Sequence, residues 1–153
     1  AYVWEQMMPE RLGLERPSHV EIKELTAFLT EQKLDWRSIS LAAAAYVDPT
    51  HAVRVPGRHE LIRGLCTAVL STSLQELFFR RERAFPVGST QLQFAQPALA
   101  DQLTRARLQD AQASGVQTLI CEDPATLYHL NRFAGEYGLE VKGGYELLAD
   151  QIV

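Results

Sequence analysis

Apolar residues form two kinds of pattern along this chain, short uninterrupted runs and longer stretches with helical spacing. The runs predict strands at residues 41–47, 74–79, 116–121 and 139–142, and a weaker pattern predicts a short strand at 19–22. Apolar positions three or four residues apart predict helices at 1–14, 24–33, 61–69, 99–113, 127–137 and 145–152. Because strands separated by helices indicate βαβ units, we expect an α/β fold with a mostly parallel sheet and helices on both faces.

Proline, glycine and aspartate mark the ends of several predicted helices. Pro97 suits a first helical turn, and Gly115 suits the end of the same helix. Asp123 and Pro124 predict another helix start, because the carboxylate accepts hydrogen bonds from free backbone N–H groups and the proline ring fixes φ. We therefore expect the strand at 116–121 to lead almost directly into a helix.

One strand–helix pattern occurs twice. Residues 20–23 read VEIK and residues 139–142 read LEVK, and each precedes a helical segment with two adjacent large apolar residues. The two copies are 119 residues apart. A repeat of this kind predicts that residues 1–34 are the tail of a preceding repeat, packed on a main domain at 41–153, in a fragment of a longer protein. Coincidence is the alternative, because few residues match.

Composition and charge narrow the classes of function. The chain of 153 residues, 46% of them hydrophobic, is long enough to bury one core. Its net charge of -4 argues against a nucleic-acid surface and an anionic membrane partner. Two cysteines, Cys66 and Cys121, form neither a disulfide framework nor a zinc pattern, which fits the reducing cytoplasm. No apolar run approaches the roughly 20 residues of a transmembrane helix.

Three loops follow predicted strands and precede predicted helices. They lie at residues 46–58, 86–90 and 123–126. In open α/β sheets, ligands bind at the carboxyl ends of the strands, where such loops gather. We therefore expect the three loops to form one site.

The motifs in these loops resemble those of the cysteine-rich CCG domain. The first reads Asp48-Pro49-Thr50-His51 with Gly57-Arg58, the second Arg80-Arg81-Glu82-Arg83 before Pro86-Val87-Gly88, and the third Asp123-Pro124-Ala125-Thr126. There are 35 residues between Thr50 and Pro86 and 35 between Val87 and Asp123, gaps that fall within the family's cysteine pattern. The family occurs in pairs of domains in heterodisulfide reductase subunits and in iron–sulfur subunits of glycolate, lactate and glycerol-3-phosphate oxidising systems.

The resemblance implies that the ligand positions of this copy have lost their chemistry. The positions equivalent to the family's cysteines are Thr50, Pro86, Val87, Asp123 and Thr126, and none is cysteine. Iron in such clusters needs thiolate sulfur, and proline and valine offer no ligating side chain. We expect no cofactor and no catalytic residue in this domain, and the resemblance places any 4Fe-4S cluster elsewhere in the parent protein. The domain would then be a scaffold whose partner is a sister CCG repeat or an oxidoreductase subunit.

A small-anion or small-ligand binding module is the alternative function. Its pocket would occupy the former cluster cavity and add Asp48, His51, Arg54, Arg58, Gly88, Ser89 and Thr90 to the ligand-equivalent positions. The arginines would meet a carboxylate or phosphate. A zinc site from His51 with Asp48 or Asp123 and Cys121 is less well specified by spacing, and Cys121 also suits a small buried hydrophobe. No local signature of nucleophilic catalysis is present.

Overall fold

A computed structural model describes the chain except residues 1, 2, 56 and 89 and the side chains of Val53, Arg54 and Thr90. It divides into two compact units, Ala1–Leu34 and Asp35–Val153. The first unit contains the π-helical turn η1 (Val3–Met7) and the helices α1 (Met8–Leu12) and α2 (Leu25–Glu31). The strand predicted at 19–22 is absent from the described residues, because a strand exists only where a neighbour pairs with it and none does here.

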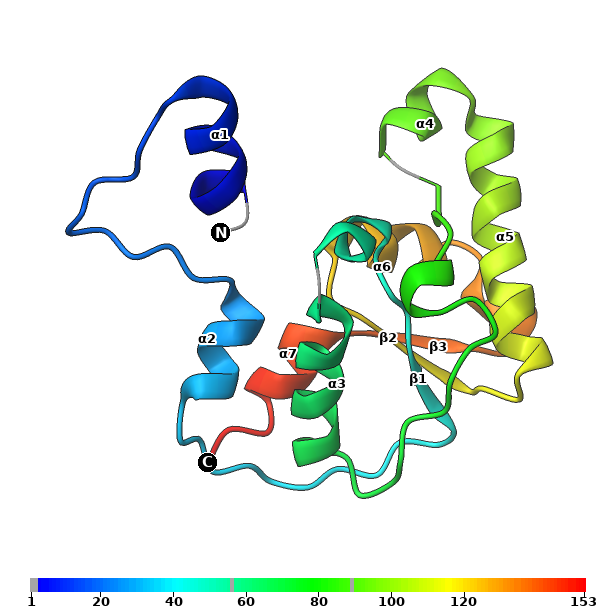
Figure 1. The fold of residues 1–153 in the computed structure, drawn as a ribbon. Helices are drawn as coiled ribbons and strands as arrows, with labels where there is room; N and C mark the ends of the chain where they lie inside the picture. The colour runs from blue at the N-terminus through cyan, green and yellow to red at the C-terminus, as the bar shows by residue number, and fades with distance from the viewer. Residues whose placement is uncertain (1–2, 56, 89) are drawn as a thin grey trace. The chain divides into compact units, whose positions relative to one another are not determined.

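The second unit is built on a three-stranded parallel sheet. Its strands β1 (Ala44–Tyr46), β2 (Thr118–Cys121) and β3 (Glu140–Gly143) lie in the order β1-β2-β3 (Figure 1). The register places Ala45 beside Leu119 and Leu119 beside Val141. Every residue of β1 and β2 is buried, which explains why both strands read as continuous apolar runs. The predicted α/β class with a parallel sheet is confirmed.

Helices follow the strands, and those near 61–69, 99–113 and 145–152 lie where the apolar spacing predicts them, whereas the helix predicted at 127–137 is divided in two and a short helix at 90–95 was not predicted. The helices are α3 (Arg58–Val69), α4 (Thr90–Ala95), α5 (Pro97–Ala113), α6 (Pro124–Asn131) and α7 (Gly144–Ala149), with 3-10 turns η2 (Thr50–Arg54), η3 (Arg81–Arg83) and η4 (Ala134–Tyr137). α3 packs against α7, and α5 packs against α6. In the described part of the chain, no helix is long and apolar enough to cross a membrane.

The predicted strand at 74–79 is wrong. Only Gln75 pairs with the sheet, through a single parallel bridge to Ala45. Leu77 is buried in the core, but Phe78 is 59% exposed, so the run is not the fully buried strand that its composition suggests. The chain instead leaves the sheet and turns toward the end of β1, where the N–H group of Arg81 finds an acceptor.

Close backbone packing fixes the loop that precedes α4. Gly88 is buried and has φ +55°, in the left-handed region that favours glycine. A Cβ atom at this position would lie 2.7 Å from the carbonyl oxygen of Ala100 in α5. Only glycine therefore allows this loop to lie against α5 without a backbone shift.

We expect Gly88→Ala to lower the free energy of unfolding by about 2 kcal/mol or more, because it adds backbone strain and a contact with α5. Urea unfolding monitored by circular dichroism measures the change. Gly64→Ala is the matched control, since Gly64 lies inside α3 with nothing within 4 Å of an added Cβ. The control should gain about 0.5–1 kcal/mol. Equal effects of the two substitutions would contradict this account of the loop.

Candidate functional site

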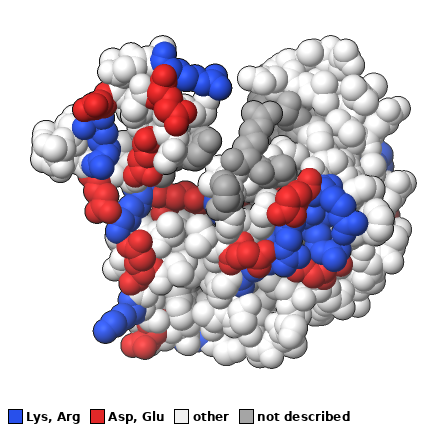
Figure 2. Space-filling model, in the orientation of Figure 1, with Lys and Arg blue, Asp and Glu red and all other residues white. Residues whose placement is uncertain are grey.

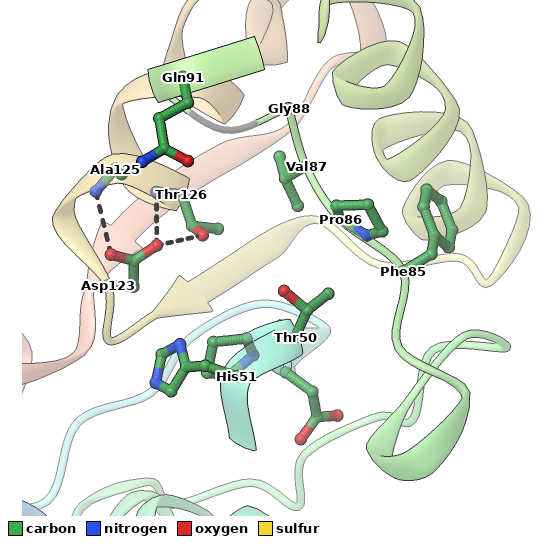
Figure 3. Close-up of a pocket in the computed structure, with 12 residues that line it drawn as sticks. Thr50, His51, Phe85, Pro86, Val87, Gly88, Gln91, Asp123, Ala125 and Thr126 are labelled. Atoms are coloured by element: carbon green, nitrogen blue, oxygen red, sulfur yellow. Dashed lines mark hydrogen bonds between the residues drawn. The ribbon is translucent and has the colours of Figure 1, made fainter. Parts of the chain in front are cut away.

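The three predicted loops line one pocket of about 290 Å³ at the carboxyl end of the sheet. Its lining residues are Asp48, Pro49, Thr50, His51, Phe85, Pro86, Val87, Gly88, Gln91, Asp123, Ala125 and Thr126. Figure 3 shows that the segments after β1, before α4 and after β2 contribute from different sides. Parallel strands bring their carboxyl ends to one edge, so loops distant in sequence meet there.

All five ligand-equivalent positions line this pocket. Thr50 opens η2 and is exposed, Pro86 is exposed, and Val87 is 7% exposed and belongs to the main apolar core. Asp123 and Thr126 lie at the start of α6. The donor set contains two hydroxyls, one carboxylate and no thiolate, so the residues present do not fit an iron–sulfur cluster.

Asp123 caps α6, as predicted. Its carboxylate accepts hydrogen bonds from the backbone N–H of Ala125 at 3.3 Å and of Thr126 at 2.9 Å, and from the Thr126 hydroxyl at 2.5 Å (Figure 3). These bonds use the N–H groups that a helix N-terminus would otherwise offer to an external anion. The cap thus places a negative charge of the protein itself where a bound anion would lie.

Asp48 lies at the end of β1 and faces a buried network behind the pocket. Both carboxylate oxygens accept hydrogen bonds from the Arg63 guanidinium at 2.7 Å, and one also accepts from the Arg81 backbone N–H at 2.9 Å. The Asp48 side chain is completely buried. Burial raises the pKa of this carboxyl, but the hydrogen bonds from Arg63 and Arg81 outweigh burial and hold the pKa below its ordinary value.

Arg58, predicted as a pocket residue, does not line the pocket. Its guanidinium pairs with Glu122, and both side chains are almost completely buried. Glu122 also accepts a hydrogen bond from the Tyr46 hydroxyl at 2.7 Å. Burial and the neighbouring Glu122 carboxylate raise the pKa of Tyr46. Arg58 therefore neutralises a carboxylate at the end of β2, which leaves it unable to meet an anion in the pocket.

The remaining predicted pocket residues divide into two groups. Asp48, His51 and Gly88 line the pocket. Ser89 and the side chains of Arg54 and Thr90 lie outside the described residues.

The histidine nearest to Asp48 is His59, not the predicted His51. The buried His59 places Nδ1 3.5 Å from Asp48 Oδ1, whereas His51 is exposed. Cys121 is 1% exposed within the apolar core, as a small buried hydrophobe would be, and burial raises the pKa of its thiol. Among the described residues, no group of three His, Cys, Asp or Glu side chains is placed to hold a metal ion.

Arg63 and Glu122 are the important residues that the loop motifs did not indicate. Arg63 shares the face of α3 that buries Ile62 and Cys66. An arginine within an apolar helical stripe signals a buried carboxylate partner, because burying an unpaired charge is very costly. The sequence shows Arg63 within such a stripe, but it does not show that Asp48 is the partner.

Charges on the surface are interspersed. On the face seen in Figure 2, basic side chains lie beside acidic ones. The arginines next to the second motif follow this arrangement, since Arg80 pairs with Glu76 at 3.5 Å and Arg81 pairs with Glu60 at 2.6 Å. Such pairing reduces the positive potential that would attract a nucleic-acid backbone.

Comparison with family models, curated proteins and solved structures yields no match to this chain. The resemblance to the CCG family therefore stays a prediction from residues and spacing. The pocket and its buried network are the observations from which a function can be proposed.

We expect Asp48→Asn to lower the free energy of unfolding by about 2–3 kcal/mol at neutral pH, because the buried Arg63 guanidinium loses its buried carboxylate partner and keeps only the more exposed Glu76, 3.3 Å away. Urea unfolding measures the loss. Glu136→Gln removes one partner of the exposed Arg105–Glu136 pair and should leave the midpoint nearly unchanged.

Wild type and Asp48→Asn can also be compared as a function of pH. A carboxyl with a lowered pKa in the folded state stabilises the protein above its unfolded pKa, about 3.9, and this stabilisation disappears as pH falls through the folded pKa. The difference in stability between wild type and Asp48→Asn should therefore narrow below about pH 4. A difference that stayed constant down to the lowest accessible pH would show that the ion pair is not its source.

Proposed function

We propose that this chain is a degenerate CCG-type domain of an iron–sulfur oxidoreductase-like protein related to heterodisulfide reductase, and that it acts as a scaffold without its own cluster. One observation carries the proposal. The five positions that the spacing equates with the family's cysteines surround a single pocket, and they are occupied by Thr50, Pro86, Val87, Asp123 and Thr126. A site that keeps this arrangement without thiolates suits a domain that retained its fold and lost its redox chemistry.

The buried network supports a structural role. The polar groups at the carboxyl end of the sheet bond to one another, as Asp48 does with Arg63 and Glu122 with Arg58. In the proposed parent protein, a cytoplasmic oxidoreductase, electrons would pass through 4Fe-4S clusters outside this chain. This domain, with helices on both faces of its sheet, would hold a sister repeat or a partner subunit in place.

A small-ligand binding module is the second candidate, and the pocket itself favours it. The polar groups of the pocket, however, argue against the anion that the sequence suggested. Asp48 and Asp123 are the charged residues among its described lining, and both are acidic. A neutral or cationic ligand would suit these groups better than a carboxylate or phosphate.

Restoring the cysteines tests the scaffold proposal. Wild-type protein reconstituted with iron and sulfide in the absence of oxygen should retain no iron and show no visible absorption. A variant with Thr50→Cys, Pro86→Cys, Val87→Cys, Asp123→Cys and Thr126→Cys should retain iron in a stoichiometric amount, because the pocket would then hold thiolates from all three loops. Metal analysis and the visible spectrum are the measurements.

A matched control carries five cysteines at exposed positions outside the pocket, namely Ser71, Ser73, Gln112, Gln117 and Asn131. It measures the iron that thiols bind nonspecifically. If the pocket variant retains no more iron than this control, the assignment of the five positions is incorrect. Stoichiometric iron in the wild type would instead contradict the loss of the cluster.

A further inference from the structure

The outer edge of β3 carries no strand among the described residues. The sheet has the order β1-β2-β3, so β3 pairs with β2 on one side only, whereas the opposite edge of the sheet already carries the bridge from Ala45 to Gln75. No residue of β3 is buried, although every residue of β1 and β2 is. An open edge of this kind offers backbone N–H and C=O groups with which another strand can pair.

The register of the sheet shows which groups of β3 point outward. The Glu140 N–H donates to the Gln117 carbonyl at 2.9 Å, and alternate residues of a strand in a parallel ladder bond to the same neighbour. Val141 lies between Glu140 and Lys142, so its N–H and C=O groups point away from β2. Within the described chain, no backbone bond outside the sheet uses either group. Val141 is therefore the residue to which an added strand would bond.

A groove of about 290 Å³ lies along this edge. β3 contributes Val141, α6 contributes Leu127 and Asn131, and α7 with the residue after it contributes Glu146 and Asp150. All of its lining residues belong to the unit Asp35–Val153, and none of them lines the pocket at the carboxyl end of the sheet. The groove is thus a separate site within one unit.

One part of the groove is apolar. Leu127 and Val141 both pack against the main apolar core and are partly exposed. Side chains of a strand alternate between the two faces of a sheet, so a residue of an added strand directly beside Val141 would face the same side and contact Leu127. Every second residue of a bound segment should therefore be apolar.

Another part of the groove is acidic. Glu146 and Asp150 are four residues apart, which places both exposed side chains on one face of α7. The Glu146 carboxylate lies over the end of β3, since a Cβ atom at Gly143 would be 2.5 Å from its Oε2. The guanidinium of Arg37 donates to the backbone carbonyl of Asp150 at 2.8 Å and not to its carboxylate.

The cation in the lining is already paired. Lys142 is the one Lys or Arg among the described lining residues, and its Nζ lies 2.6 Å from the carboxylate of Glu140. The carboxylates of Glu146 and Asp150 therefore remain for cations of a partner. A groove with a surplus of negative charge attracts basic side chains and repels acidic ones.

We propose that this groove binds an extended segment of a partner protein in which apolar and basic side chains alternate, and that the segment adds a strand beside β3. Its backbone pairs with Val141, its apolar side chains contact Leu127, and its basic side chains meet Glu146 and Asp150. A second copy of this chain is a less suitable occupant, because its net charge of -4 would on balance repel it from an acidic groove. The inference does not depend on the loss of the cluster cysteines.

Titration of the isotope-labelled full chain with a synthetic peptide tests the proposal by amide NMR. The probe has about six residues that alternate valine and lysine. The amide signals of Val141 and Gly143 should shift to saturation, and that of Thr126 in the other pocket should not. Two control peptides, one alternating valine and glutamate and one with the valines and lysines in separate blocks, should bind at least about tenfold more weakly. Equal binding of the block peptide would show charge attraction alone and overturn the proposal.

Two N-methylated forms of the alternating peptide test strand pairing. One is methylated at the valine nitrogens and the other at the lysine nitrogens. Because only alternate N–H groups of an added strand face β3, one form should lose binding and the other should retain it. Equal affinities of the two forms would contradict the addition of a strand.

The double variant Glu146→Gln with Asp150→Asn tests the acidic part of the groove. Its Kd for the alternating peptide should rise about threefold or more, because two charge interactions are lost. The matched control, Glu10→Gln with Glu82→Gln, removes as much charge at exposed positions outside the groove and should leave the Kd nearly unchanged. Equal Kd values of the two double variants would show that these carboxylates do not recognise the peptide.

Hydrogen exchange on the unaltered chain tests whether the edge is free. The Val141 amide should exchange at least about tenfold faster than the amides of Glu140 and Lys142, which bond to β2. Equal protection of the three amides would place another segment of this chain on the edge. Protection of Val141 that grows with protein concentration would place a second copy there, and either result would overturn the proposal.

Discussion

The buried pair between Asp48 and Arg63 holds together the elements around which the second unit is built. Asp48 lies two residues after β1, and Arg63 lies in the middle of α3. The backbone N–H of Arg81, in the segment that follows Gln75, donates to the same carboxylate. A carboxylate without exposure to water needs all of these donors, because an unsatisfied buried charge would destabilise the fold by several kcal/mol. This requirement fixes where the strand, the helix and the loop meet.

The need to pair these buried charges also determines which polar groups line the pocket. Arg58 and Arg63 neutralise Glu122 and Asp48 inside the protein, and Asp123 uses the free N–H groups of α6. Among the residues that the structure describes, the pocket is thus left with hydroxyls, an imidazole, an amide, carboxylates and apolar side chains. These groups can shape a cavity or an interface, but they offer neither the thiolates of a cluster nor an arrangement of cations for an anion.

A comparison of the two units separates the effects of local sequence on backbone conformation from the effects of tertiary packing. Residues 21–24 and β3 have closely similar sequences, and the helices that follow them begin at equivalent positions. Only β3 is paired as a strand, because only β3 has β2 beside it. The extended conformation and the helix start are therefore local properties, whereas the strand and the burial of the helix are properties of the assembled sheet.

The sequence by itself determined the parallel α/β class, the strands near 41–47, 116–121 and 139–142, the Asp123 cap and the meeting of three loops at one edge. These follow from apolar periodicity and from residues close together in the chain. The tertiary structure decided which polar groups face one another, so Arg58 turned to Glu122 rather than to the pocket. It also decided that only Gln75 among residues 74–79 pairs with β1, so this apolar run forms no continuous strand. Pairing and burial depend on residues far away in sequence, and no local pattern encodes them.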